Sequence, residues 1–178
     1  MPACSEDLVL SDQQILAVQA GLKKPGVMIH IDNGWDTQLQ TNWYSGLTSS
    51  GVVSTKDRDI IGLSFYPFYG TQARFSNLAI TMRTLATEYN KPIMVAETDF
   101  PTECVGKYMR KPTLSKPSIP ASADGQTRWV KKVIDLVKGV PSGLGQGVFY
   151  WEAASNNNTS LGSACEDVTL FKSDWSKR

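Results

Sequence analysis

A glutamate stands at the end of an apolar run, where the chain should still be buried. The stretch PIMVAETDFPTEC contains the strand-like residues Ile93–Ala96, and Glu97 follows them directly. A carboxylate is stable in such a place only when hydrogen bonds or charges compensate for its lost water. Carboxylates of this kind occur in enzyme sites and also in structural ion pairs with Lys or Arg. Glu97 is therefore the first candidate for catalytic chemistry, with a structural ion pair or a solvated strand end as alternatives.

Polar and aromatic residues also stand at the ends of three other apolar runs. They are His30 and Asp32, Ser64 and Tyr66, and Trp151 and Glu152, while Asp99 adds a second carboxylate just beyond Glu97. Alternate residues of a strand point to the same face. The residues of equal parity are His30 with Asp32, Ser64 with Tyr66, Trp151 with Phe149, and Glu97 with Val95 and Asp99. An aromatic ring beside carboxylates suits a sugar, which has an apolar ring face and a rim of hydroxyls, so these residues predict a carbohydrate site.

Four nearly continuous apolar runs alternate with helical stretches, and they are the elements that must position these side chains. The predicted strands are Gly26–Asp32, Arg58–Tyr66, Pro92–Thr98 and Gln146–Glu152, and the predicted helices are Ser11–Leu22, Thr37–Leu47, Ser76–Tyr89 and Gly125–Gly139. Continuously apolar strands are typical of a parallel sheet that is covered on both faces. Alternating strands and helices form either a doubly wound sheet or a (β/α) barrel.

Two features favour the barrel. Polar residues stand at the carboxyl end of every predicted strand, which is where barrel enzymes build their sites. No strand is followed by the G-x-G-x-x-G turn of a dinucleotide-binding fold. A complete barrel needs eight strands and about 250 residues. The sequence therefore predicts half of a barrel, with residues 1–178 as one partial catalytic domain.

Composition excludes several other classes of function. Lys+Arg 18 and Asp+Glu 17 leave a net charge of +1, so there is no electrostatic reason to expect nucleic acid or an anionic membrane as partner. No run of 18 or more apolar residues is present, and the first residues do not have the pattern of a signal peptide. The three cysteines, Cys4, Cys104 and Cys165, are far apart, and His30 is the single histidine. We therefore predict no metal site and no cofactor.

Five stretches carry a family resemblance. MIHIDNGWD, DIIGLSFYPFYG, VAETDFP, GQGVFYWE and LGSACED occur in this order from residue 28 onward. Together they resemble the second half of the arabinogalactan endo-β-1,4-galactanases, glycoside hydrolase family 53. The resemblance implies an α/β fold that is the C-terminal half (strands 5–8) of a (β/α)8 TIM barrel. It also implies a secreted, extracellular enzyme that degrades β-1,4-galactan in pectin by a retaining double displacement.

The same resemblance implies roles for individual residues. Glu97 matches the catalytic nucleophile, Tyr66 a tyrosine beside it, and Trp151 the aromatic floor under the sugar. The other expected substrate-binding residues are His30, Asp32, Asn33, Trp35, Ser64, Asp99 and Glu152. Cys104 and Cys165 match a disulfide of fungal members, which leaves Cys4 free, and the loop after Thr98 lacks the acidic residues of a calcium site.

The second carboxyl group that this mechanism needs is the element we expect to be absent. A retaining glycosidase places its acid/base about 5–5.5 Å from the nucleophile. In the family it is a glutamate after an asparagine on the fourth strand, and neither Glu6 nor Asp7 has that context. Two functions therefore remain, an endo-galactanase or segment of one, and an inactive remnant that binds glycan weakly or not at all. A related barrel glycosidase for another β-linked glycan is a third.

Purely structural roles also remain open for the residues that are expected to surround Glu97. His30 can be a core histidine, Tyr66 and Trp151 can be core aromatics, and Glu152 can cap the last turn. Half of a barrel leaves its outer strands unpaired and one side of its core open. Exposed strand edges and apolar patches favour association. We therefore expect the isolated chain to self-associate.

Overall fold

Four strands and the helices between them make up the part of the chain that the structure describes. The computed structural model describes residues 12–49, 51, 58–67, 70–102, 119–154, 168–172 and 174–177. The elements in chain order are α1 (Asp12–Gln19), β1 (Met28–Ile31), α2 (Thr37–Ser49), β2 (Ile60–Ser64), α3 (Phe75–Tyr89), β3 (Ile93–Thr98), α4 (Ala123–Lys138), the short 3-10 turn η2 (Pro141–Gly143) and β4 (Gly145–Tyr150). The predicted strands and helices are all present, and the strands are shorter at their ends than the apolar runs.

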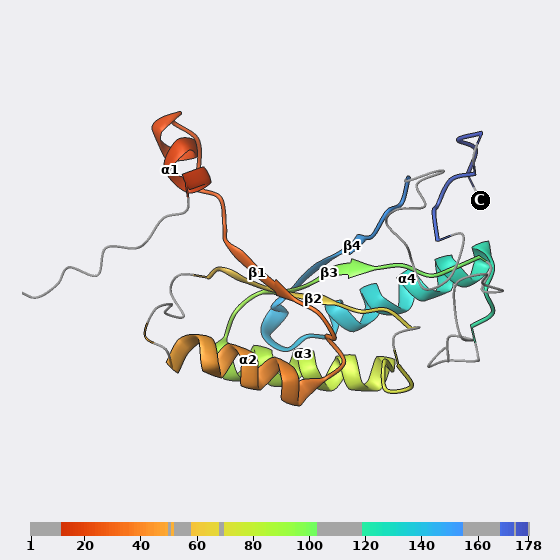
Figure 1. Cartoon of the computed structure of the whole chain (residues 1–178), viewed down its shortest axis with the longest axis horizontal. Coiled ribbons are helices and arrows are strands. Elements are labelled where there is room, and N and C mark those ends of the chain that lie inside the picture. Colours follow the sequence, from red (N-terminus) through yellow and green to blue (C-terminus); the bar gives the residue numbers. More distant parts are fainter. Residues whose placement is uncertain are drawn as a thin grey trace, which may run out of the picture.

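The strands form one parallel sheet in the order β1-β2-β3-β4. Strands β1, β2 and β3 are each followed by a helix that returns the chain to the start of the next strand. Helices α2, α3 and α4 lie on one side of the sheet, while α1 is set apart beyond the start of β1 (Figure 1). Within the described residues, β1 and β4 are the two edges of an open sheet. This is the arrangement that the alternating sequence pattern predicts for half of a barrel.

Strand β3 contains an irregularity that the parity argument did not foresee. Leu63 pairs with Val95, but the next residue, Ser64, pairs with Glu97. On the other side of β3 the register also shifts between Val95 and Thr98. Strand β3 therefore holds one more residue than its neighbours at this point, as in a β-bulge.

The bulge changes the face on which Glu97 lies. Val95 and Thr98 are both fully buried, and the Thr98 hydroxyl contacts the indole of Trp129 on α4. Since adjacent residues point to opposite faces, Glu97 lies on the side of the sheet away from the helices. The prediction that Glu97 shares a face with Val95 is wrong, because the extra residue reverses the alternation between them.

An aromatic cluster holds the helices to the carboxyl half of the sheet. The Trp129 side chain is fully buried, with its ring centroid 5.2 Å from that of Phe65, 4.6 Å from that of Phe75 and 5.2 Å from that of Phe100. Its indole nitrogen donates a hydrogen bond of 2.9 Å to Thr98 Oγ1. On α3, the buried residues Leu78, Met82 and Leu85 recur at helical spacing and form the face that packs in the core. These contacts fix the ends of β2 and β3.

A buried cation joins α2 and α3 near the start of β2. The guanidinium carbon of Arg58 lies 4.6 Å from the ring centroid of Tyr44 and 4.6 Å from that of Tyr89. Burial lowers the pKa of Arg58 and raises the pKa of Tyr89 to about 12. Cation–π contacts of this kind stabilise a desolvated arginine. They therefore secure the end of the sheet that is opposite to Glu97.

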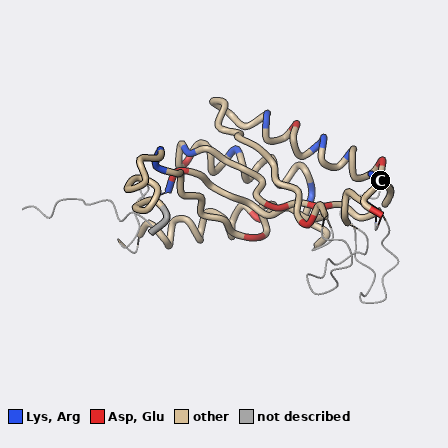
Figure 2. Tube along the Cα trace, turned by 90° about the horizontal axis from the view of Figure 1, so that it is seen from above, with Lys and Arg blue, Asp and Glu red and all other residues tan. Residues whose placement is uncertain are grey.

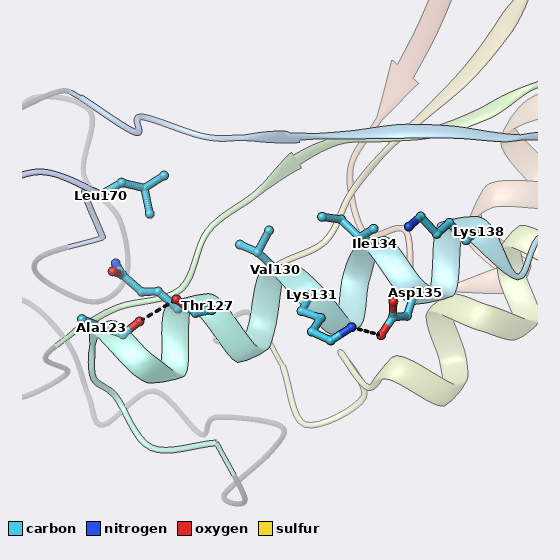
Figure 3. Close-up of a pocket in the computed structure, with 9 residues that line it drawn as sticks. Ala123, Thr127, Val130, Lys131, Ile134, Asp135, Lys138 and Leu170 are labelled. Atoms are coloured by element: carbon cyan, nitrogen blue, oxygen red, sulfur yellow. Dashed lines mark hydrogen bonds and ion pairs between the residues drawn. The ribbon is translucent and has the colours of Figure 1, made fainter. Parts of the chain in front are cut away.

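One side of α4 carries a groove of about 510 Å³. Its walls include Val130 and Ile134 on α4 and Leu170 from the C-terminal segment, and an ion pair between Lys131 and Asp135 lies along it (Figure 3). None of the predicted site residues lines this groove. In the part of the chain that the structure describes, no helix has the length and apolar character needed to cross a membrane.

Candidate active site

Glu97 lies at the carboxyl end of β3 and is held there by hydroxyl groups from the neighbouring strand. Its Oε2 accepts a hydrogen bond of 3.1 Å from the Ser64 hydroxyl and one of 3.0 Å from the Tyr66 hydroxyl. Among the described residues, no Lys or Arg forms an ion pair with Glu97. The carboxylate is thus paired with neutral donors and an imidazole. The alternative of a structural Lys or Arg ion pair has no support in this part of the chain.

His30 lies beside the same carboxylate. Its Nε2 is 2.7 Å from Ser64 Oγ, and its Nδ1 is 3.8 Å from Glu97 Oε1. About a quarter of each side chain is exposed, 27% for His30 and 25% for Glu97. The two residues are therefore accessible from solvent and are not sealed in the core.

The parallel sheet explains why these residues meet although they are far apart in the sequence. β1, β2 and β3 are adjacent and parallel, so their carboxyl ends lie together. Gly62 pairs with His30 across the sheet, and a Cβ at Gly62 would come within 3.0 Å of His30 Cβ. The absence of a side chain at Gly62 therefore leaves room over β2 for the Cβ of His30 and for the Met28 side chain. Figure 2 shows several acidic residues close together on one part of the trace, whereas Lys and Arg lie along a helix and at the other end of the molecule.

A second carboxyl group, Asp99, stands two residues after Glu97 in the chain and interacts electrostatically with it. The Asp99 side chain is 1% exposed, and its Oδ1 has no hydrogen-bond partner among the described residues. Burial raises its pKa well above the ordinary value, and the negative charges of Glu152 and Glu97 raise it further. Glu152 has a raised pKa as well, mainly through burial. This part of the site therefore favours a protonated, neutral Asp99.

Replacing Asp99 by asparagine should stabilise the protein at neutral pH. The folded-state pKa of Asp99 is raised, so the folded protein binds more protons than the unfolded chain between the two pKa values. The free energy of unfolding should therefore fall as pH rises through this window. Asp99→Asn removes the cost of protonating on folding a carboxyl group that is ionised in the unfolded chain, and we expect it to raise the free energy of unfolding at pH 7 by about 1–3 kcal/mol.

Urea unfolding at one fixed protein concentration measures this effect. The gain should shrink as the pH is lowered toward the range in which an unfolded aspartate is protonated, about pH 4. Asp135→Asn is the matched control, because Asp135 is exposed on α4, and it should change stability by about 0.5 kcal/mol or less. A less stable Asp99→Asn protein at pH 7 would contradict the prediction.

The loop after β1 carries three further predicted residues, Asp32, Asn33 and Trp35, and their surroundings differ. Gly34 N donates to the Ser64 carbonyl at 2.8 Å, so the loop folds back over the end of β2. Asp32 is exposed, and its Oδ2 accepts a hydrogen bond from Asn33 Nδ2. Trp35 instead packs against the hydrophobic core and lines a separate pocket of about 270 Å³ beside α3. None of these contacts joins the three residues to Glu97, so their part in a sugar site stays a prediction.

Trp151 and Glu152 directly follow β4. Trp151 is 40% exposed, and its backbone N–H donates to the Thr98 carbonyl at 2.8 Å, which ties the end of β4 to the end of β3. Glu152 has a φ of 52°, and its Oε1 is buried without a hydrogen-bond partner among the described residues. An exposed indole at the carboxyl end of the sheet is available to a ligand, and it is not a core residue.

Two residues that hold the segment after β3 in place, Gln126 and Tyr150, were not among the predicted site residues. Gln126 on α4 is 3% exposed, and its Nε2 donates to the carbonyls of Phe100 at 2.8 Å and Val168 at 3.1 Å. The Tyr150 hydroxyl donates its single proton to the Val168 carbonyl at 2.6 Å, and its oxygen lies 3.2 Å from the Phe100 carbonyl oxygen. Together they fix the segment that follows Asp99. Gln126 stands three residues before Trp129, on the helix face that also carries the buried Val133, and this spacing was the sequence signal that could have identified it.

Some predicted residues cannot be placed. Cys4, Cys104 and Cys165, as well as Glu6 and Asp7, lie outside the described residues, so the disulfide stays a prediction. Among the residues that are described, no group of three or more His, Cys, Asp or Glu side chains could hold a metal ion.

Comparisons with known proteins place these residues in a family. Residues 7–177 match the model of glycosyl hydrolase family 53. The arabinogalactan endo-β-1,4-galactanase of Thermothelomyces thermophilus is 41% identical over 148 residues, which are 83% of this chain and 44% of the relative. A probable arabinogalactan endo-β-1,4-galactanase A of Aspergillus fumigatus is 42% identical over 156 residues, which are 87% of this chain and 42% of the relative.

A solved structure of a fungal β-1,4-galactanase agrees with the fold. It superposes with a TM-score of 0.79 at 39% identity and covers 86% of this chain and 46% of the other. The chain thus spans less than half the length of these relatives. The expected fold class, the second half of a (β/α)8 barrel, is confirmed by this likeness together with the parallel βα order of the sheet. Because the family model covers nearly the whole chain, the chain belongs to glycosyl hydrolase family 53.

Proposed function

We propose that the chain is the catalytic-nucleophile half of an endo-β-1,4-galactanase, with Glu97 as the nucleophile. The observation that carries this proposal is the setting of Glu97, whose Oε2 accepts hydrogen bonds from Ser64 and Tyr66 while His30 lies beside Oε1. The names of the relatives supply the substrate class, arabinogalactan or β-1,4-galactan. The exposed Trp151 indole is the surface on which a galactose ring would stack.

The two oxygens of Glu97 have different roles in the proposed reaction. Because Oε2 already accepts two hydrogen bonds, Oε1 is the atom that attacks the anomeric carbon. A bond from Oε1 to that carbon forms while the bond to the glycosidic oxygen breaks, and the departing oxygen takes a proton from a general acid. Water then attacks the same carbon, gives a proton to the same group and releases Glu97, so the anomeric configuration is retained.

The general acid in this scheme comes from outside the described residues. Asp99 is the carboxyl group that interacts electrostatically with Glu97, but it is buried and cannot meet a leaving oxygen. We propose that the part of the family's barrel that this chain does not span supplies the acid. For the same reason, an inactive protein that binds glycan weakly is the second candidate function.

A chimera tests the proposed function. The first half of the Thermothelomyces galactanase is joined in front of this chain, and reducing sugars released from β-1,4-galactan are measured. We expect the chimera to cleave galactan and the chain alone to show no measurable cleavage, because loss of general acid catalysis alone lowers the rate about 10²–10⁴-fold. An inactive chimera that is folded would favour the inactive remnant, and activity on xylan instead of galactan would indicate another β-linked glycan.

We further propose that the chain on its own self-associates through the open side of the sheet. Met28 on β1 is 37% exposed and Phe149 on β4 is 56% exposed, while Leu16 and Val18 on α1 are 64% and 51% exposed. Light scattering should show a dimer or larger assembly. Phe149→Lys should weaken it, whereas Ile80→Lys, on the outer side of α3 and also 56% exposed, should not. A compact monomer at all concentrations would contradict the proposal.

A further inference from the structure

Ser64 lies between the imidazole of His30 and the carboxylate of Glu97. The side chain of Ser64 belongs to a residue that is 6% exposed, so water has little access to its hydroxyl. Its Oγ is 2.7 Å from His30 Nε2 and 3.1 Å from Glu97 Oε2. The sequence analysis expected Ser64 to bind substrate. With both neighbours at hydrogen-bond distance, the hydroxyl is already engaged inside the protein.

The proton of this hydroxyl can serve only one of its two neighbours. An ionised carboxylate is an acceptor only, so Ser64 donates its single proton to Glu97 Oε2. The Ser64 oxygen must then accept a hydrogen bond from His30 Nε2. Nε2 therefore carries a proton whether the imidazole is neutral or charged, and in the neutral ring Nδ1 is bare.

We propose that Ser64 is a positioning residue that fixes the tautomer of His30, so that Nδ1 is a hydrogen-bond acceptor beside the attacking oxygen of Glu97. Nδ1 is 3.8 Å from Oε1, which is too far for a direct hydrogen bond, and both side chains are about a quarter exposed. A hydroxyl of the bound sugar next to the attacked carbon can donate to Nδ1. The role in catalysis rests on the proposed function, but the tautomer itself does not.

The single histidine of the chain makes the tautomer directly measurable. Nitrogen NMR of the imidazole in the full chain, at a pH high enough for the ring to be neutral, separates protonated from bare ring nitrogens. Couplings to the ring C–H protons identify which nitrogen is Nε2, and no other histidine contributes signals. We expect Nε2 to be protonated and Nδ1 to be bare. A wild-type ring with the proton on Nδ1 would overturn the proposal, whatever the chimera does on galactan.

Substitution of Ser64 supplies the second test. In Ser64→Ala the ring loses its acceptor at Nε2, and the negative charge of the Glu97 carboxylate, 3.8 Å from Nδ1, then favours a proton on Nδ1. We therefore expect the Nδ1-protonated tautomer to become the major form. Ser64→Thr keeps the hydroxyl and should retain the wild-type tautomer, and Ser76→Ala, at an exposed serine on α3, should leave the imidazole spectrum unchanged.

The outcomes separate this proposal from the proposed function. An unchanged imidazole spectrum in Ser64→Ala would refute the positioning role, even if the galactanase chimera were fully active. A switched tautomer in Ser64→Ala with restoration in Ser64→Thr would support it, even if the chimera were inactive. The amide spectrum of each variant shows whether it has kept the native fold.

Discussion

Galactan cleavage by the chimera is expected to fall by about 10³-fold or more in kcat when Glu97 is replaced by glutamine, because removing the nucleophile of a covalent mechanism has effects of this size or larger. The amide has nearly the same shape as the carboxylate and can still accept hydrogen bonds from Ser64 and Tyr66. It cannot form the bond to the anomeric carbon, so the loss should be in kcat with little change in KM.

Glu88→Gln is the matched control for this variant. Glu88 is exposed near the C-terminal end of α3 and interacts with Tyr89, at the end of the sheet that is opposite to Glu97, so the same chemical change there should leave the cleavage rate unaltered. Both variants are compared at equal protein concentration, with reducing sugars as the measurement. If Glu97→Gln kept most of the activity of the chimera, the nucleophile would have to be another residue and the proposed mechanism would fail.

Replacement of Trp129 by alanine is expected to cause the largest loss of stability. Its indole is fully buried, packs against the rings of Phe65, Phe75 and Phe100, and donates a hydrogen bond to Thr98. Removing a buried tryptophan typically lowers the free energy of unfolding by about 3–5 kcal/mol, through lost burial and the cavity that remains. This is a large fraction of the 5–15 kcal/mol or so that stabilises an ordinary domain. Urea unfolding followed by circular dichroism measures the loss.

Two further variants show which part of the tryptophan matters. Trp129→Phe keeps most of the ring packing and removes the indole N–H, so it should lose about 0.5–1.5 kcal/mol for the hydrogen bond to Thr98, in addition to a smaller cavity. Trp43→Ala removes a tryptophan that is 40% exposed on α2 and should have the smallest effect. Equal losses for Trp129→Ala and Trp43→Ala would show that the aromatic cluster does not hold the helices to the sheet.

The sequence by itself determined the elements and part of the candidate site. Continuous apolar runs such as Ile93–Ala96 identify strands of a parallel sheet, and spaced apolar residues such as Leu78, Met82 and Leu85 identify the buried face of a helix. Parallel strands that alternate with helices end at one edge. The polar residues after those runs therefore had to lie near one another, and the grouping of His30, Ser64, Tyr66 and Glu97 followed.

Only the tertiary structure decided how these residues face each other. Pairing of β3 with β2 and β4 placed an extra residue after Val95 and so turned Glu97 away from the helices. Packing of the loop after β1 moved Trp35 toward the core, and packing behind β3 buried Asp99. The physical reason is that apolar pattern and parity are properties of one segment. Register, burial and the direction of a hydrogen bond depend on neighbours that come from distant parts of the chain.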